Sequence, residues 1–170
     1  MAIIETARLL LRELSLDDAE FILRLLNEPS FVQNIGDKGV RTLEDARTYI
    51  MNGPMASYQR FGFGPWLVET KQSQAVGICG LLKREVLEDA DIGYALVPEF
   101  WSRGFAAEAA LGVLSYARNQ LGLKRLLAAA NADNLNSIRL LEKIGFRFER
   151  MTRLTEGEPE VKLFAFAVDD

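Results

Sequence analysis

A short segment rich in small residues, with one arginine, stands where a strand pattern changes to a helix pattern. A helix that begins here exposes backbone N–H groups at its positive end, and Gly104 and Ala106 leave an approaching anion unobstructed. Arg103 adds a guanidinium beside the turn. The segment can therefore cradle a phosphate group, although a glycine near a helix start also serves as a simple turn. Its sequence is Ser102-Arg103-Gly104-Phe105-Ala106-Ala107.

The composition excludes several catalytic devices before any fold is considered. The chain has no histidine and a single cysteine, Cys79. Histidine-dependent nucleophiles, histidine metal sites and internal disulfides are therefore ruled out. Cys79 lies inside a predicted strand without an activating base, so we expect a packed, inert thiol. An enzyme of this composition must use carboxylates, hydroxyls, backbone groups or water, and we expect no metal.

Length and charge favour one soluble domain that spans residues 1–170. The chain is 49% hydrophobic and 26% charged, as soluble globular proteins are. Its formal net charge of −4 argues against nucleic acid as a partner. No apolar run reaches membrane-spanning length, and the N-terminus lacks a signal-peptide pattern. We therefore expect a cytoplasmic protein that does not associate with membranes.

The elements around the small-residue segment form a strand–helix–strand unit. Residues 91–97 alternate between two faces, and Pro98 ends this strand by removing a ladder donor. From Phe105 onward an apolar stripe follows helical spacing. Residues 124–130 form an almost continuous apolar run, which is typical of a strand buried on both faces. We expect the two strands to be parallel, with a right-handed connection.

The flanking segments predict further strands and helices, and hence an α/β (α+β) chain with a mixed sheet. Residues 55–65 carry aromatic side chains among glycines, which either line a groove or fill the core beneath a loop. The other strands are expected at residues 8–12, 66–70, 75–82, 146–150 and 161–166. Helices are expected after the caps Ser15 and Thr42, around residues 31–34, and from Asn134 to a Schellman-type end at Gly145 and Phe146.

Several motifs follow one another in a characteristic order. They are Thr6–Arg12, Trp101–Ala109, Asn134–Ser137 and Glu142–Phe146. In this order and spacing they make the chain resemble the GNAT N-acyltransferases, and more narrowly the RimJ/RimL-like branch, which includes ribosomal-protein N-terminal acetyltransferases. The resemblance covers nearly the whole chain. It implies a mixed, mostly antiparallel central sheet flanked by helices, built around the parallel strand–helix–strand unit.

The resemblance implies acetyl-CoA as co-substrate. The family's cofactor loop is written Gln/Arg-x-x-Gly-x-Gly/Ala, and Trp101 in its first place departs from the general pattern but looks normal for the branch. By resemblance, the sheet splays after the 91–97 strand and the pantetheine arm lies in the gap. The backbone of Leu96 and Val97 would bond its amides and donate to the thioester oxygen. The pyrophosphate would be held by the backbone N–H groups of Arg103, Gly104, Phe105, Ala106 and Ala107.

Two polar residues near the next helix start match the branch's Asn-x-x-Ser motif. Asn134 is expected to cap that helix, to contact the cofactor, or both. By resemblance, Ser137 is the candidate to protonate the leaving thiolate. Many relatives carry a tyrosine further along this helix, but the position is Leu141 here. The acid is therefore either Ser137 or water.

Direct transfer is the simplest chemistry that these residues allow. A neutral amine would attack the thioester in a ternary complex, and a carboxylate acting through water would take the proton. Glu156 is preferred because the C-terminal hairpin borders the acceptor site in this branch. Each candidate can equally be a solvated surface charge. The candidates are Glu85, Glu88, Asp91 and Glu156.

The acceptor amine and the assembly state stay open at this stage. The acceptor is a protein N-terminal α-amine, or alternatively a small-molecule amine or amino acid. A peptide requires an open groove and a small metabolite a closed pocket around residues 31–63. A non-catalytic acyl-CoA-binding module on the same scaffold is a further alternative. We expect a monomer or a homodimer.

Overall fold

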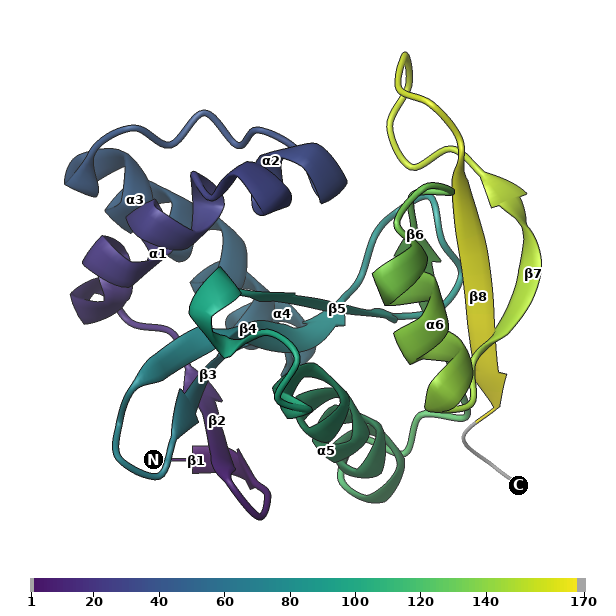
Figure 1. The fold of residues 1–170 in the computed structure, drawn as a ribbon, viewed down its shortest axis with the longest axis horizontal. Helices are drawn as coiled ribbons and strands as arrows, with labels where there is room; N and C mark the ends of the chain where they lie inside the picture. The colour runs from purple at the N-terminus through teal and green to yellow at the C-terminus, as the bar shows by residue number, and fades with distance from the viewer. Residues whose placement is uncertain (1, 168–170) are drawn as a thin grey trace.

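The computed structural model describes residues 2–167 and contains an eight-stranded sheet flanked by helices (Figure 1). The strand order is β1-β2-β3-β4-β5-β6-β8-β7, and every neighbouring pair is antiparallel except β5 and β6. This is the mixed, mostly antiparallel sheet that the sequence predicts. The strands are β1 (Ala2–Glu5), β2 (Leu9–Glu13), β3 (Pro65–Thr70), β4 (Ala75–Leu82), β5 (Asp91–Leu96), β6 (Arg125–Ala130), β7 (Arg147–Thr152) and β8 (Val161–Ala167).

The helices precede the third strand or connect the later strands. Short 3-10 turns, Leu16–Asp18 and Pro98–Phe100, and a π-helical turn, Met51–Met55, complete the helical segments. The α-helices are α1 (Ala19–Leu26), α2 (Pro29–Asn34), α3 (Leu43–Ile50), α4 (Ala56–Phe61), α5 (Phe105–Asn119) and α6 (Leu135–Lys143).

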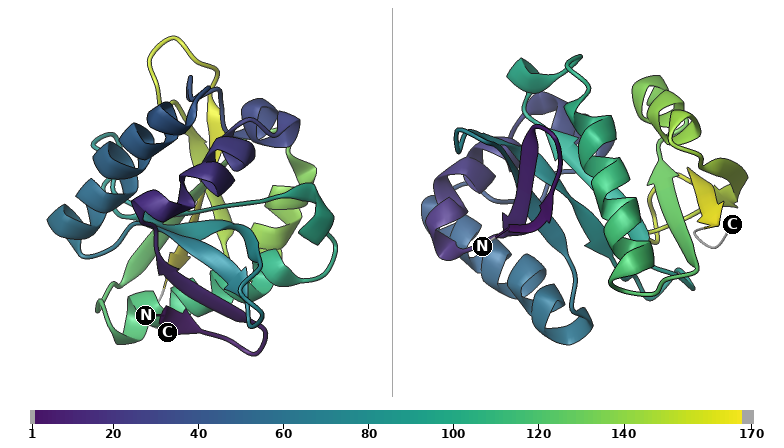
Figure 2. Two further views of the ribbon diagram at one scale, coloured as in Figure 1. Left: turned by 90° about the vertical axis from the view of Figure 1, so that its left-hand side faces the viewer. Right: turned by 90° about the horizontal axis from the view of Figure 1, so that it is seen from below.

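The two faces of the central strands carry different helices (Figures 1 and 2). Trp66, Cys79 and Tyr94 are in register across β3, β4 and β5, so their side chains share one face. That face is covered by α5, because the Trp66 ring packs edge-on against Tyr116 of this helix with ring centroids 5.4 Å apart. The opposite face, on the side of α1 to α4, carries the next residues in the same register, Leu67, Ile78 and Ala95.

The sheet separates between β5 and β6. Strand β5 pairs with β4 along its whole length, from Leu96 opposite Gly77 to Asp91 opposite Leu82. Its pairing with β6 covers Asp91 and Ile92 alone. Beyond Ile92, the β5 edge that faces β6 therefore has no strand partner within residues 2–167. The gap predicted from the family resemblance lies at this place.

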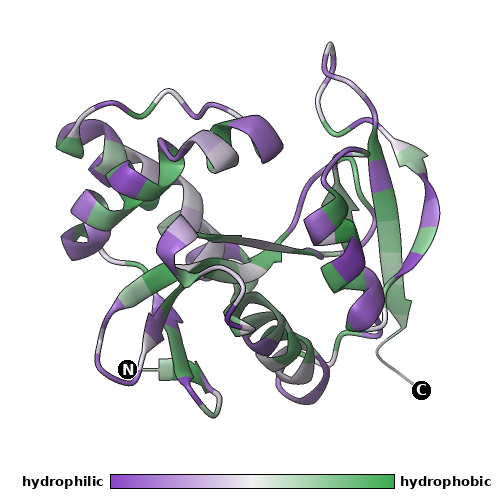
Figure 3. Cartoon of the chain, in the orientation of Figure 1, coloured by the Kyte–Doolittle hydropathy of each residue, from purple (hydrophilic) through white to green (hydrophobic). Residues whose placement is uncertain are grey.

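Buried hydrophobic residues from the sheet and the helices form one large core. Figure 3 shows hydrophobic residues in both the strands and the helices. Helices α1 and α6 show both hydrophilic and hydrophobic colour, as amphipathic helices do. Helix α5 buries one stripe against the sheet, as its spacing predicts. No helix within residues 2–167 combines the length and apolar character needed to cross a membrane. The buried stripe consists of Phe105, Ala109, Ala110, Val113, Leu114 and Ala117.

The predicted helix ends are confirmed by their hydrogen bonds. Ser15 and Thr42 each form a capping box with the aspartate three residues later. The Asn134 side chain accepts a bond from the Ser137 N–H at 3.3 Å. At the end of α6 the Phe146 N–H donates to the Leu141 carbonyl at 2.9 Å, in the six-residue closure of a Schellman motif.

The aromatic segment after α3 fills the core. Residues 51–61 continue as a π-turn and α4. For residues 55–65, the sequence left open whether the aromatic side chains line a groove or fill the core beneath a loop. The Tyr58 hydroxyl donates to the Pro65 carbonyl and accepts from the Leu14 N–H at 3.0 Å. The Phe61 and Phe63 rings stack with centroids 5.7 Å apart. These contacts support the core-filling alternative.

We expect Gly77→Ala to destabilise the fold by about 3 kcal/mol, the upper range for overpacking. A Cβ atom at this position would lie 2.2 Å from the Ala95 carbonyl oxygen and 2.7 Å from the Leu96 Cα, so β5 would have to move. At Gly93 on the neighbouring strand, an added Cβ would meet Leu82 Cδ1 at an ordinary 3.7 Å. Urea unfolding should therefore separate Gly77→Ala from Gly93→Ala, and equal midpoints would contradict the prediction.

Candidate active site

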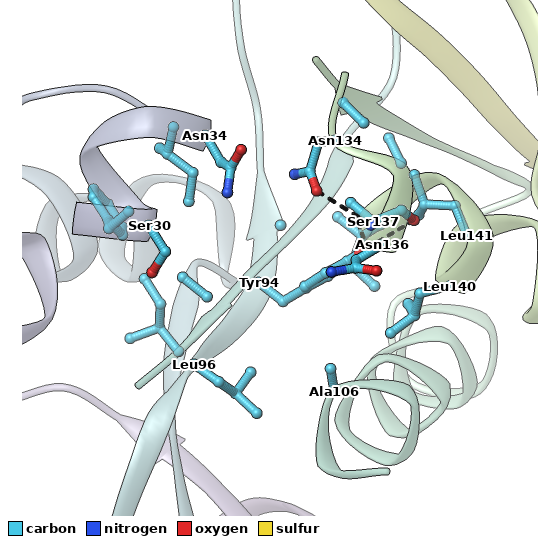
Figure 4. Close-up of a pocket in the computed structure, with 18 of the residues that line it drawn as sticks. Ser30, Asn34, Tyr94, Leu96, Ala106, Asn134, Asn136, Ser137, Leu140 and Leu141 are labelled. Atoms are coloured by element: carbon cyan, nitrogen blue, oxygen red, sulfur yellow. Dashed lines mark hydrogen bonds between the residues drawn. The ribbon is translucent and has the colours of Figure 1, made fainter. Parts of the chain in front are cut away.

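A cavity of about 640 Å³ opens where β5 and β6 separate (Figure 4). Its walls come from α1 to α3, the β4–β5 edge, the start of α5, the end of β6 and α6. Segments far apart in the sequence therefore meet around one space. The residues that matter most for its chemistry are Asp91, Tyr94, Leu96, Gly104, Asn134 and Ser137.

The loop before α5 presents free backbone donors to this cavity. Gly104 adopts a left-handed conformation, with φ of 79°. Ser102 has φ of 60°, a conformation that non-glycine residues rarely adopt and that often marks a functional site. The helix makes its first internal bond from the Glu108 N–H to the Gly104 carbonyl at 3.1 Å. The preceding N–H groups therefore have no helical acceptor. They belong to the cavity-lining residues Phe105, Ala106 and Ala107.

An ion pair between Arg8 of the N-terminal hairpin and Glu108 of α5 supports this loop. Arg8 Nε donates to Glu108 Oε1 at 2.7 Å, and the Arg8 backbone N–H donates to Glu108 Oε2 at 2.8 Å. The Thr6 hydroxyl donates to the same carboxylate. Arg8 Nη1 also donates to the Arg103 carbonyl at 2.9 Å, and its guanidinium lies 4.4 Å from the Phe105 ring centroid. The loop conformation thus depends on residues about a hundred positions earlier.

The Arg103 side chain lies outside the cavity lining. Its guanidinium is placed over the rings of Phe100 and Phe105, at 5.3 and 5.0 Å from their centroids. Its carbonyl accepts the bond from Arg8. Because Arg8 is paired with Glu108, Arg103 is the residue that adds positive charge beside Gly104, which favours anion binding at this loop.

Of the two residues predicted to bond the pantetheine arm through their backbone, Leu96 and Val97, the β5 edge leaves Leu96 available. The Val97 N–H donates to the Val76 carbonyl at 3.0 Å, and its carbonyl accepts from the Phe100 N–H at 3.1 Å. Because successive residues of a strand turn their backbone groups to opposite sides, the Leu96 N–H faces the gap. The Leu96 carbonyl accepts a bond from the Trp101 indole Nε1 at 2.9 Å. Of the two residues, Leu96 lines the cavity and Val97 does not.

Two hydroxyl groups meet across the cavity, and the sequence linked only one of them with catalysis. The Tyr94 hydroxyl lies 2.8 Å from Ser137 Oγ (Figure 4). Burial raises the pKa of Tyr94 to about 12, against the opposing effect of its bond to Ser137, so the phenol is protonated at neutral pH. The Asn134 cap fixes the first turn of α6 beside them. Tyr94 shares a strand face with Leu96, and this period of two was the available sequence signal.

Asp91 is the candidate base that the structure places in the cavity wall. Its side chain is 2% exposed, and both carboxylate oxygens accept from Arg84 Nε at 3.2 and 3.3 Å. Burial raises the pKa of Asp91 to about 6, although Arg84 lowers it. The other three candidates are exposed and do not line the cavity; they are Glu85, Glu88 and Glu156, the last in the turn between β7 and β8.

Cys79 is buried beside Tyr94 on the α5 face of the sheet, as the inert-thiol prediction requires. Burial raises the pKa of this thiol to about 12, so the reactive thiolate is not formed at neutral pH.

Comparison with known proteins shows to which family the chain belongs. The acetyltransferase (GNAT) domain family matches residues 8–147. This chain belongs to the GNAT acetyltransferase family. The match covers the cofactor loop, the separated strands and α6, and it identifies the chain as an acetyl-CoA-dependent N-acetyltransferase.

Individual GNAT relatives resemble the chain over most of its length. The uncharacterized N-acetyltransferase YoaA of Bacillus subtilis is 32% identical over 155 residues, which cover 89% of this chain and 86% of YoaA. A solved GNAT acetyltransferase from Bacillus anthracis has a TM-score of 0.80 at 25% identity, covering 97% and 98% of the two chains. RimL, a ribosomal L7/L12 alpha-N-protein acetyltransferase solved with coenzyme A, has a TM-score of 0.82 at 22% identity, covering 99% of both. At this identity, the likeness to RimL concerns the fold.

Proposed function

We propose that this GNAT enzyme acetylates a primary amine by direct attack in a ternary complex with acetyl-CoA. The observation that carries the proposal is the separation of β5 from β6, because one cavity there joins the phosphate-binding loop to Tyr94, Ser137 and Asp91. The pantetheine arm would lie along the open β5 edge. Its pyrophosphate would meet the N–H groups at the start of α5.

The leaving thiolate requires a proton, and the Tyr94–Ser137 pair is placed to supply it. In this proposal the Ser137 hydroxyl donates to the thiolate while the Tyr94 hydroxyl donates to Ser137 Oγ, and solvent then restores the tyrosine proton. The Leu96 N–H donates to the thioester oxygen as negative charge develops on it. A hydroxyl pair thus replaces the tyrosine that many relatives carry at the position of Leu141.

The attacking amine must lose a proton, and Asp91 is the group we propose to receive it. Asp91 lies three residues before Tyr94, which corresponds to about 10 Å along a strand. Because the thioester would lie near Tyr94, the amine proton would reach Asp91 through water. The two residues project to opposite faces of β5. Acid and base therefore approach the cavity from different sides, so that the proton of the incoming amine and the proton for the leaving thiolate are handled by separate groups.

Asp91→Asn should lower kcat/KM by about a hundredfold at neutral pH, as removal of a general base does. The wild-type kcat/KM should rise with pH through about 6, because the carboxylate must be deprotonated to accept a proton. The asparagine variant should lose this limb of the pH profile. Glu156→Gln is the matched control, and if it removes the limb while Asp91→Asn keeps it, the base is Glu156.

Calorimetric titration with acetyl-CoA, together with CoA, ATP and NADH, tests the proposed function directly. We expect binding of acetyl-CoA and CoA alone, followed by amine-dependent release of free thiol. Binding without thiol release for any primary amine would instead indicate a non-catalytic acyl-CoA-binding module. Equal binding of ATP would contradict the cofactor assignment.

Two acceptor classes are compatible with this chemistry. A protein N-terminal α-amine, and with it membership of the RimJ/RimL-like branch, is supported by the sequence motifs and by the fold shared with RimL. A small-molecule amine is favoured by one hydrogen bond. Asn131 Nδ2 donates to the Asn34 carbonyl at 3.0 Å and ties the end of α2 to the segment after β6. Both residues' segments border the cavity, so this bond restricts the room for a polypeptide.

A further inference from the structure

The charges in the cavity wall differ from those of the whole molecule. The chain has 24 acidic residues and a net charge of −4. Among residues 2–167, however, Asp91 is the one acidic residue in the cavity lining, against four basic residues. The chain as a whole has more acidic than basic residues, so the shortage of acidic residues in the cavity lining is local. It indicates that the cavity binds negatively charged groups. The basic residues are Lys38, Arg84, Arg139 and Lys143.

The four basic residues divide between two ends of the cavity. Arg139 and Lys143 lie on α6, the helix that carries Ser137, and their charges suit the phosphates of the co-substrate. Lys38 follows α2. Arg84 follows β4 and pairs with Asp91, whose side chain projects from β5 to the face opposite that of Tyr94, on the side of α1 to α4. These two basic residues therefore belong to the end where the acceptor amine would enter.

The acceptor end has a positive charge that no described carboxylate neutralises. Arg84 and Asp91 form a pair whose charges cancel when the carboxylate is ionised. Lys38 forms no ion pair with a carboxylate of residues 2–167, and its neighbour Asp37 binds Arg41 at 2.6 Å instead. A ligand with a negative charge could be bound by Lys38 and by the free Nη groups of Arg84, since Arg84 uses Nε to hold Asp91.

Neutral polar side chains also line the acceptor end of the cavity, and the volume of the cavity limits the size of the acceptor. Ser30 and Asn34 of α2 and Tyr49 of α3 line the same end (Figure 4 labels the first two). The cavity of about 640 Å³ must also hold the pantetheine arm, and the Asn131–Asn34 bond closes part of its border. A small acceptor fits these limits, because sites of this volume typically enclose single small molecules.

We propose that the acceptor is a small primary amine that also carries an anionic group, a carboxylate or a phosphonate. This inference rests on the proposed acetyltransferase function and names its substrate class. The anion would bind Lys38 and Arg84, which leaves the amine to face the thioester with Asp91 nearby. A polyamine would instead need several unpaired carboxylates at this end of the cavity. The positive charge of Lys38 repels such a cationic ligand.

Matched pairs of acceptors test the proposal on the full-length enzyme. Thiol release from acetyl-CoA is measured with free amino acids, their primary amides, aminoalkylphosphonates, spermidine and peptides with free N-termini. We expect kcat/KM for the acid to exceed that for its amide by about tenfold, as one charge-assisted contact provides. Lys38→Gln should reduce the acid's value by a similar factor and leave the amide unchanged. Lys162→Gln on β8, outside the cavity lining, is the control and should change neither value.

Three results would overturn the inference and leave the acetyltransferase function intact. The first is faster turnover of spermidine or a peptide than of any anionic amine. The second is an equal effect of Lys38→Gln on acid and amide. The third is turnover of uncharged amines alone. Failure of acetyl-CoA itself to bind would instead contradict the proposed function.

Discussion

Gly104→Glu should reduce the affinity for acetyl-CoA by a hundredfold or more. Gly104 has φ of 79°, a conformation that costs a residue with a side chain about 1–2 kcal/mol. A Cβ atom there would lie 3.2 Å from Arg8 Nη2, so it disturbs the ion pair that holds the loop. The added carboxylate also repels the pyrophosphate. Each charge-assisted hydrogen bond contributes roughly 1.5–3 kcal/mol, and losing two of them accounts for this factor.

The control for this variant lies near the other end of the same helix. Gly122 also has a positive φ, of 65°, and an added Cβ there meets no atom within 4 Å. Gly122→Glu therefore adds the same side chain at a similarly strained position without approaching the cavity. Calorimetric titration of both variants with CoA should show loss of binding in Gly104→Glu alone. Equal affinities would mean that the start of α5 does not bind the pyrophosphate.

Ser137→Ala should lower kcat by a factor between about a hundred and a thousand, within the range for general acid catalysis. Tyr94→Phe removes the second hydroxyl of the relay while it keeps the ring, and we expect a loss of tenfold or more. Because the two groups act in series, the double variant should lose little more than Ser137→Ala. The affinity for CoA should be unchanged in all three, since the pyrophosphate contacts lie elsewhere.

The combined effect of the two substitutions and an independent tyrosine distinguish this relay from a structural role. Tyr116→Phe also removes a tyrosine hydroxyl, but this tyrosine lies on α5 outside the cavity lining. It should leave kcat for proton delivery to the thiolate near its original value. Additive losses in Ser137→Ala and Tyr94→Phe would show that the two hydroxyls act separately, and water would then be the acid.

The sequence predicted the elements whose signals are local. The strand before Pro98, the helix from Phe105 and the caps at Ser15 and Thr42 each depend on residues within a few positions of one another. The segment from residue 51 to residue 61 was not predicted as helical. It contains Gly53 and Pro54, which disfavour a regular helix, and the chain uses a π-turn there.

The arrangement of the site depends on contacts that local patterns do not encode. Tyr94 and Ser137 are 43 positions apart and meet because β5 and β6 separate after two paired residues. Asp91 could be distinguished from the three other carboxylates only by burial, which depends on the packing around Arg84. Four residues of the predicted cofactor loop line the cavity, because the loop lies within one strand–helix junction; they are Gly104, Phe105, Ala106 and Ala107.

The ion pair between Arg8 and Glu108 couples the N-terminal hairpin to ligand binding at the cofactor loop. Thermodynamic linkage is reciprocal, so a ligand that orders this loop must also stabilise the turn between β1 and β2 to the same degree that this turn favours the ligand. Amide hydrogen exchange in residues 6–8 should therefore slow when CoA binds, although these residues do not line the cavity. The N-terminal hairpin then acts as an energetic part of the co-substrate site, and a fusion that strains it would weaken CoA binding from a distance.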